Sequence, residues 1–373
     1  MPTVSAQKLE RWLGPEAEHI SKAMRGWYGP PIAVGNVPGR IHATNDGDFR
    51  GVLSETKFDN LVHAGWSKTQ RGLQTLERAV RRNRGRMSAG FASLSDLISE
   101  ATAGAKRYEY QFQKVGPTGV VAATSSLWGS GNQPIAGATA GNAPGGTVPT
   151  SATTGSWPFT NPTGGDTQHI VSGYPLSSVA GNTLLLYDRL FAVNKTMAST
   201  ATEAVTGVPT RYTSGTGTAA DYIGGNFLFV EIGGTQLAAT GHNWTVCQYT
   251  NQASTGGQTL PSLTGNSSGI VWRLDHPTNQ WFAPLASGDV GIKALTQMQC
   301  SASVATGVIN FVIGHPIAWM PCPVVNMVCV MDGINSAFNL ARIFDSACLA
   351  FLEVSKPSTT ATTYTGSFTS VAG

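Results

Sequence analysis

The side chains best suited to chemistry form a cluster of arginines. Five lie within nine positions, at Arg78, Arg81, Arg82, Arg84 and Arg86. Guanidinium groups at this density can bind phosphate oxygens or pair with the carboxylates of a partner. No aromatic residue alternates with them to stack on bases, and charge runs are usually solvated or face a partner. We interpret the cluster as a helix end that is solvated or that faces a partner and pairs with carboxylates of another copy; phosphate binding, including nucleic acid, is the alternative, which no other feature supports.

One pentapeptide matches the motif of a nucleophilic serine. Residues Gly265–Gly269 have the form G-x-S-x-G, in which a hydrolase places its serine on a turn between a strand and a helix. Here a Thr- and Gly-rich turn precedes the motif and the strand-like Ile270–Trp272 follows it. Because Gly occupies 44 of 373 positions, a chance match is expected. No Gly-Lys dipeptide is present, which excludes a standard phosphate-binding P-loop.

Histidines and cysteines lack the spacing of a metal site. Four histidines follow residue 116, at His169, His242, His276 and His315. None is paired as in zinc motifs, and no Cys-x-x-Cys occurs. The cysteines are odd in number, so we interpret all of them as buried free thiols, at Cys247, Cys300, Cys322, Cys329 and Cys348. We therefore expect no metal and no cofactor.

Acidic and aromatic residues suggest a glycosidase only weakly. Carboxylates occur at Asp188, Glu203, Asp221, Glu231 and Asp275, and tryptophans at Trp244, Trp272 and Trp281. Such an enzyme needs one protonated and one ionised acid facing a cleft. The neighbours Asp188-Arg189 and Arg273-Leu274-Asp275 resemble local structural ion pairs or interface pairs, and the tryptophans lie in or beside strand-like runs as core residues. We assign no catalytic residue and expect a protein that is not an enzyme.

The charges divide the chain into two segments. Residues 1–116 contain 17 Lys+Arg and 11 Asp+Glu, whereas residues 117–373 contain only 7 and 10. An exposed surface with so few charges is poorly protected against association. We therefore expect the Gly- and Thr-rich second segment to cover much of its surface with copies of itself, and residues 1–116 to form a charged, largely helical N-terminal arm.

The elements of the arm are mainly helices. Apolar spacing predicts helices over Ser5–Trp27 and Lys57–Arg82, the second ending in the arginine cluster. A third is predicted over Leu94–Thr102, after the capping pattern Ser93-x-x-Asp96 and before Gly104. The alternating aromatic and polar residues of Arg107–Gln113 predict a half-buried strand.

The second segment has the pattern of a β domain. Seven short runs are rich in β-branched and aromatic residues, at Thr183–Val193, Asn226–Ile232, Asn243–Thr250, Gly269–Leu274, Cys300–Val304, Val308–Ile313 and Asn326–Met331. They predict a mainly β fold, a β-sandwich, of which a jelly roll is one form. The span Gly129–Gly165 should be a surface loop or an arm ordered by a partner. A C-terminal helix is predicted over Ile334–Val354, and Ser355–Gly373 should be an extended tail on the surface or on a neighbour.

Several short stretches of the sequence resemble virion structural proteins of tailed bacteriophages. They are Leu184–Phe191, Thr206–Tyr212, Gln248–Ala253 with Gly256-Gly257, and Phe282–Ile292. The resemblance covers roughly residues 90–354 and includes no catalytic signature. It implies a non-enzymatic subunit of the particle that assembles as a homo-oligomer in or on the head shell, as capsid or cement (decoration) protein. A tail or fibre component that binds a host receptor or glycan is the alternative.

The expected location follows from the same features. The first twelve residues carry Lys8, Glu10 and Arg11 and no apolar core of a secretory signal. The most apolar stretch, Val308–Val330, is interrupted by prolines and a histidine and does not predict a membrane span. We expect synthesis in the bacterial host cytoplasm, residence in the virion, and other copies and other virion proteins as partners, with no membrane partner.

Overall fold

The chain is described in two parts. The computed structural model describes residues 3–4, 42–43, 49–50, 91, 93–104, 106–212, 225–334 and 340–373. It contains two compact units, Met1–Ala92 and Ser93–Gly373. In the first unit, three short strands form an antiparallel sheet in the order β1-β3-β2, with β1 at Thr3–Val4, β2 at His42–Ala43 and β3 at Phe49–Arg50. The predicted helices Ser5–Trp27 and Lys57–Arg82, and the arginine cluster, lie outside the described residues.

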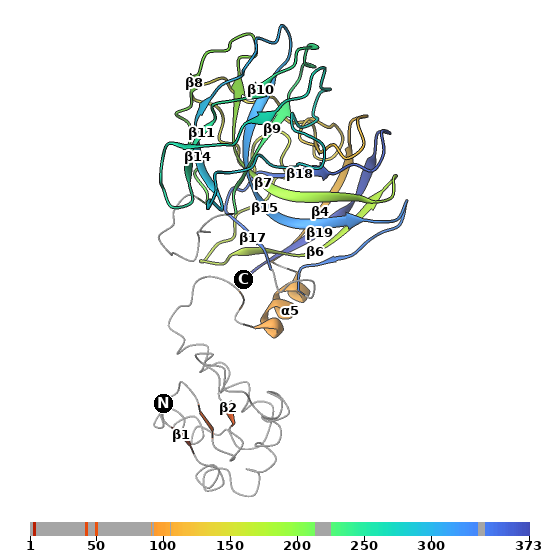
Figure 1. Cartoon of the computed structure of the whole chain (residues 1–373). Coiled ribbons are helices and arrows are strands. Elements are labelled where there is room, and N and C mark those ends of the chain that lie inside the picture. The colour runs from red at the N-terminus through yellow and green to blue at the C-terminus, as the bar shows by residue number, and fades with distance from the viewer. Residues whose placement is uncertain are drawn as a thin grey trace, which may run out of the picture. The chain divides into compact units, whose positions relative to one another are not determined.

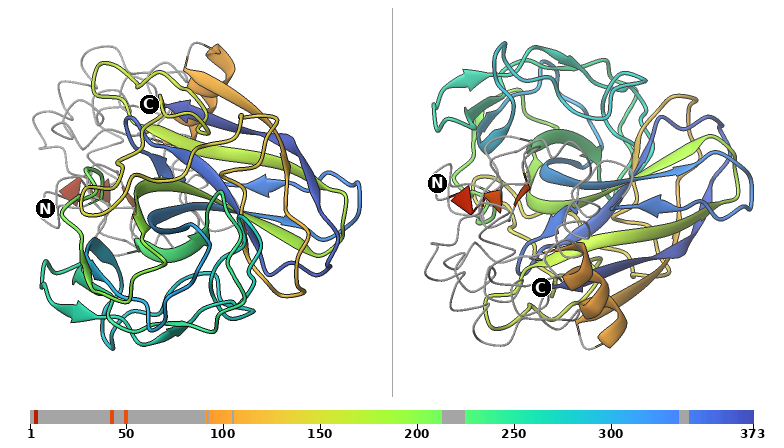
Figure 2. Two further views of the ribbon diagram at one scale, coloured as in Figure 1. Left: turned by 90° about the horizontal axis from the view of Figure 1, so that it is seen from above. Right: turned by 90° about the horizontal axis from the view of Figure 1, so that it is seen from below.

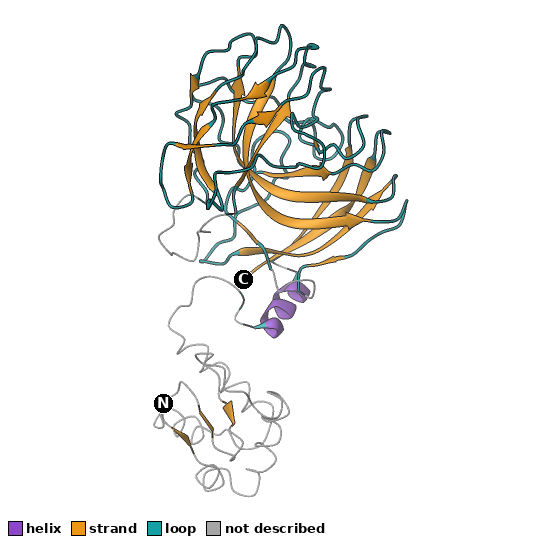
Figure 3. Cartoon of the chain, in the orientation of Figure 1, coloured by secondary structure: helices purple, strands orange, loops and turns teal. Residues whose placement is uncertain are grey.

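The second unit is mainly β, and its sheets are antiparallel (Figures 1 and 3). The central sheet has the order β5-β18-β7-β15-β9, with strands at Ser125–Ser126, Leu349–Val354, Asn182–Lys195, Ile309–Cys322 and Phe227–Ile232. The outer sheet has the order β16-β6-β19-β4, with strands at Met331–Asp332, Gln168–Ser177, Thr363–Ala372 and Arg107–Val115. Strand β17 (Arg342–Ile343) also pairs with β6.

The remaining strands are short. The small sheet has the order β12-β11-β14-β8, with strands at Gln258–Thr259, Gln248–Asn251, Ile292–Met298 and Glu203–Ala204. A separate pair joins β10 (Asn243–Trp244) to β13 (Leu263–Thr264). Among the described residues the helix is α5 (Leu94–Ala103).

Strands β7 and β15 pair along their whole length and form the axis of the second unit. They lie side by side in both views of Figure 2. Ile313 faces Phe191 and Gly314 faces Arg189, so Leu190 is an extra residue in β7. Such a bulge reverses the alternation of side chains. Leu184 and Leu186 before it therefore share one face of the central sheet with residues 191 and 193 after it.

Three apolar cores follow from this alternation. On one face of the central sheet, one core joins it to the outer sheet through Leu186, Phe351 and Phe368. On the same face, beyond the bulge, a second core joins it to the small sheet through Phe311 and Leu295. The opposite face is covered by loops, which supply Trp128, Trp272 and Trp281 to the third core. Both faces of the central sheet are thus buried.

The local predictions around residue 100 are confirmed. The Ser93 hydroxyl accepts a hydrogen bond from the Asp96 N–H at 3.1 Å, and Gly104 ends α5 in the left-handed conformation at φ +75°. Strand β4 buries Tyr110 and Phe112 as predicted. Because β4 pairs with β19, this segment belongs to the second unit, so the compact units divide earlier than the charge-based division at residue 116.

The seven predicted runs have mixed outcomes. Three are confirmed as β7, β9 and the first half of β15, and the run Asn243–Thr250 is split into β10 and β11. The strand predictions for Gly269–Leu274, Cys300–Val304 and most of Asn326–Met331 are wrong. In the first of these, Trp272 has φ +68°, which interrupts any strand. Strand β14 was not predicted.

Two C-terminal predictions are wrong. Over the described residues 340–354 there is no helix, and the segment contains β17 and β18. All of β18 is buried, with Phe351 in one core and Leu352 in another, and a continuous apolar run of this kind fits a buried strand as well as a helix. The tail is extended as predicted, but from Thr363 onward it does not lie on the surface. It forms β19, the inner strand between β6 and β4.

The span Gly129–Gly165 is irregular but needs no partner to be packed. Thr147 pairs with Ala192 of β7, and the Trp157 side chain is buried in the core beneath the outer sheet. Its indole N–H donates to the Gln111 carbonyl at 3.1 Å. The prediction of an arm that orders only against a partner is therefore wrong.

The place of β19 gives a truncation prediction. Removing Thr363–Gly373 deletes an inner strand together with the buried rings of Tyr364 and Phe368, so we expect loss of cooperative thermal unfolding. Removing Met1–Ala92 leaves all three cores intact and should preserve the β-type circular dichroism and cooperative unfolding. A stably folded C-terminal truncation would contradict this account.

Candidate functional site

Two adjacent charged residues occupy the middle of β7. Neighbouring strand residues point to opposite faces, so Asp188 and Arg189 cannot pair with each other. The predicted local pair is therefore wrong, and each side chain has a partner on its own face. The second predicted local pair is also wrong, because Arg273 donates to Asn266 at 3.1 Å, while Asp275 binds other groups.

Arg189 forms a buried ion pair with Glu231 of β9. Its two terminal nitrogens donate to the two carboxylate oxygens, at 2.5 Å and 3.2 Å. The arginine side chain is 2% exposed and the glutamate fully buried. Asn310 of β15 donates a further hydrogen bond to Glu231 at 3.1 Å, and the guanidinium lies 4.8 Å from the centre of the Trp128 ring. The pair thus connects three strands and the covering loop.

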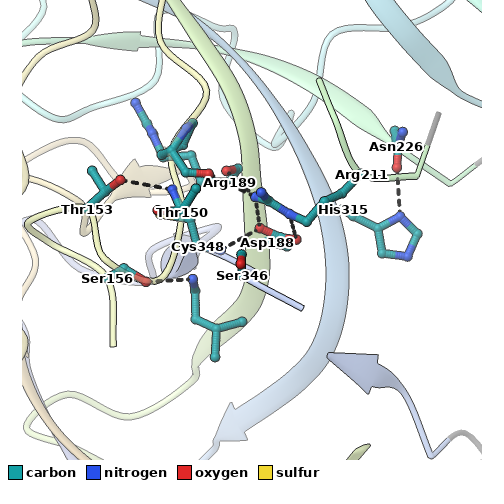
Figure 4. A network of polar contacts seen from close by, with 12 residues as sticks. Thr150, Thr153, Ser156, Asp188, Arg189, Arg211, Asn226, His315, Ser346 and Cys348 are labelled. Carbon is teal, nitrogen blue, oxygen red and sulfur yellow. Dashed lines mark hydrogen bonds and ion pairs between the residues drawn. The ribbon is translucent and has the colours of Figure 1, made fainter. Parts of the chain in front are cut away.

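Asp188 is bound on the other face by Arg211 (Figure 4). The Arg211 guanidinium donates to both carboxylate oxygens, at 2.8 Å and 2.7 Å, and also to the Pro149 carbonyl at 3.1 Å. The Cys348 N–H donates to Asp188 at 2.8 Å. One buried carboxylate therefore ties β7 to two loops and to the start of β18.

Asp275 is the centre of a third buried polar group. It accepts hydrogen bonds from His242 Nε2 at 2.9 Å, from the Trp244 indole N–H at 2.8 Å and from the Asn266 N–H at 2.5 Å. Burial opposes protonation of His242, but the hydrogen bond and the charge of Asp275 outweigh it and raise the pKa of this histidine. Its other ring nitrogen contacts the Thr240 carbonyl at 3.0 Å. This group holds two loops against β10.

His242 cannot act as the general base for Ser267, the serine of the nucleophile motif. Ser267 is exposed on a loop, while the His242 side chain is fully buried and both of its ring nitrogens are engaged. An activated serine needs a histidine nitrogen free to accept its proton. The arrangement therefore gives no support to a hydrolase.

The carboxylates considered for a glycosidase are structural. Asp188, Glu231 and Asp275 have the buried partners described above, and Glu203 pairs with Lys195 at 2.6 Å. Asp221 lies outside the described residues. Trp244 is buried, and Trp281 packs against Phe227, Phe282 and Trp319, with the ring centres 4.7 to 5.3 Å apart. The prediction of structural carboxylates and core tryptophans is consistent with this packing.

Cysteines and metal-binding residues add no catalytic centre among the described residues. Over that part of the chain no group of three His, Cys, Asp or Glu side chains could hold a metal ion. The five cysteines are free thiols, and four are buried as predicted. Cys329 is half-exposed, which corrects the prediction for that residue. No described helix is long and apolar enough to cross a membrane.

Half of the described charged residues of the second segment are buried. Of its 16 charged residues that the structure describes, eight are buried, at Asp188, Arg189, Lys195, Arg211, Glu231, Asp275, Glu353 and Lys356. Within the described part of residues 117–373, Asp345 is the charged residue whose side chain falls in the exposed class. The surface is therefore even poorer in charge than the composition indicates.

A group of large apolar side chains is exposed instead. The segment Pro323–Val330, called the apolar segment below, follows β15 and exposes five of them by 44% to 64%, at Val324, Val325, Met327, Val328 and Val330. This surface was not predicted from the sequence, because Asn326–Met331 was interpreted as a strand. The absence of charge between Ile309 and Met331 was the available signal.

Comparison with known proteins adds no assignment. No family model, curated protein or solved structure matches the chain. The candidate functional surface therefore rests on the chain's own geometry, namely an interior held by ion pairs and, over the described part of residues 117–373, a surface with few exposed charges.

Substitutions of Arg189 and Glu231 should have strongly non-additive effects on the free energy of unfolding. Glu231→Leu leaves a buried guanidinium without its carboxylate and should lower the free energy of unfolding by about 3–5 kcal/mol. The double variant Arg189→Met/Glu231→Leu should lose less unfolding free energy than the two single variants lose together, since no unpaired charge remains. Urea unfolding measures both, with half-exposed Lys293→Met as the control. Two small, additive losses would contradict the assignment.

His276 predicts a loss of stability in acid. The side chain is buried and its Nε2 accepts a hydrogen bond from the Val230 N–H at 2.9 Å. Burial lowers the pKa of His276 from 6.5 to about 4. The unfolded chain therefore takes up a proton first as the pH falls, so the stabilising contribution is complete above 6.5 and is lost toward pH 4.

The measurement compares wild type with His276→Gln. Between pH 7 and 5 the wild type should lose about 2 kcal/mol more of its unfolding free energy than the variant does. The variant itself is expected to be less stable at pH 7, because the amide replaces the ring imperfectly. Parallel pH profiles of the two proteins would show that His276 is not held neutral in the fold.

Proposed function

We propose that this protein is a non-enzymatic structural protein of a tailed-phage virion, assembling as a homo-oligomer in or on the head shell as a capsid or cement (decoration) subunit. The observation that carries the proposal is the burial of half of the few charged residues described in residues 117–373, which leaves Asp345 as the one exposed charge among them, with the others only partly exposed. The resemblance of several short sequence stretches to phage virion proteins is the reason to propose a phage particle as the assembly.

The physical argument concerns association. A protein that works as a separate molecule keeps charges on its surface, which oppose contact with its neighbours. A shell subunit replaces that surface with contacts to symmetry-related copies and needs no titratable site. The buried ion pairs suit this role, because they hold the strands and loops of a subunit in one arrangement that every copy can repeat.

Two finer points belong to the same proposal. The central and outer sheets enclose an apolar core between them, and we interpret this stack as a β-sandwich. We retain the arginine cluster, residues 78–86, as the contact with another virion component. Its partner is proposed from the charge of the sequence alone.

The proposal predicts self-association that tolerates salt. Contacts between surfaces without charge should persist at about 1 M NaCl, where the screening length is only about 3 Å. Sedimentation velocity at low and at high salt should therefore show the same oligomer. A monomer at every accessible protein concentration would refute the proposal. Dissociation by salt alone would instead indicate charged contacts.

A further inference from the structure

We propose that the apolar segment Pro323–Val330 is the centre of an interface between two copies of this chain, with the same segment on both sides. The inference rests on the proposed homo-oligomer and names its contact surface. Eight consecutive residues expose five large apolar side chains, and separate molecules seldom expose so much apolar surface in one place.

The segment presents these side chains on a fixed backbone. The Asn326 N–H donates to the Ser177 carbonyl at 2.8 Å, and the Cys329 N–H donates to the Pro175 carbonyl at 3.0 Å. Both acceptors belong to β6, so the apolar segment runs along the outer sheet beside the short strand β16. Because its backbone is already held in place, little conformational entropy is lost when a partner covers it.

The absence of charge indicates what the partner is. No Asp, Glu, Lys or Arg occurs from Ile309 to Met331. A patch of this kind can face its own copy across a two-fold axis without bringing like charges together, whereas a charged patch facing itself would be repelled. A partner with a charged surface would gain nothing here, since the segment offers no opposite charge.

The size of the patch fits the middle of such an interface. Its exposed side chains amount to on the order of 400 Å², about half of what each partner buries in a standard protein interface. Interfaces of this size have an apolar centre and a polar rim. The Ser- and Thr-rich surface of residues 117–373, on which Asp345 is the one exposed charged residue among those described, can supply a rim with little repulsion.

The test uses the full chain with Val328→Asp/Val330→Asp. Two carboxylates per copy would have to be buried without partners, so the dissociation constant should rise at least roughly 100-fold. Val290→Asp is the matched control, because Val290 is 63% exposed but lies outside the apolar segment. Sedimentation velocity compares the three proteins, and thermal unfolding verifies that each is folded.

Cys329 provides a second readout that needs no substitution in the patch. Because the other four cysteines are buried, a maleimide should label Cys329 first. In the wild type, labelling should slow as the protein concentration rises through the range where oligomers form. In the Asp variant, labelling should stay fast at all concentrations. Cys329→Ser identifies any signal from the other thiols.

Three outcomes separate the two proposals. The interface is supported if the Val328→Asp/Val330→Asp variant associates more weakly, the Val290→Asp control does not, and Cys329 of the wild type is protected at high protein concentration. A wild type and an Asp variant that associate equally tightly, with Cys329 always reactive, overturn the interface while the homo-oligomer stands. A wild type that remains monomeric overturns both, and the apolar segment would then be covered by a different molecule.

Discussion

The strand β7 buries two opposite charges next to each other, and the arrangement of the second unit depends on where their partners come from. Because adjacent strand residues face opposite sides, Asp188 and Arg189 must each be neutralised in a different compartment. Glu231 arrives from the edge strand β9 and Arg211 from a loop that follows β8. An arrangement that lacked either partner would leave a charge buried without compensation, at a cost of several kcal/mol. These pairs therefore select one strand order and one loop path.

The same use of charge determines the exterior. Eight charged side chains lie in the interior of the second segment, and the other eight that the structure describes are partly or fully exposed over the surface of residues 117–373. The apolar segment lies on that surface beside β6, held by backbone hydrogen bonds. A rigid interior and a surface that tolerates close contact are both suited to a subunit repeated in a shell. In this protein both properties follow from the burial of many of its few charged side chains.

The sequence predicted local features better than distant ones. The cap of α5 and the alternation in β4 are confirmed, because they depend on residues within a few positions of each other. The helix predicted at Ile334–Val354 is wrong over the described part of that segment, since an apolar run flanked by covered surfaces fits a strand equally well. Only the neighbouring strands β7 and β5 reveal which structure Leu349–Val354 adopts.

The candidate site follows the same division. Composition and residue spacing alone established that residues 117–373 are poor in charge and carry no zinc-type spacing, because these properties do not depend on contacts. Which of those charges lie inside, and that Val324–Val330 lies outside, was decided by tertiary structure. Asp188 and Arg211 are 23 positions apart and Arg189 and Glu231 are 42 apart, and no local pattern specifies such partners. Burial is a property of the whole packing, so it becomes visible only when the sheets are assembled.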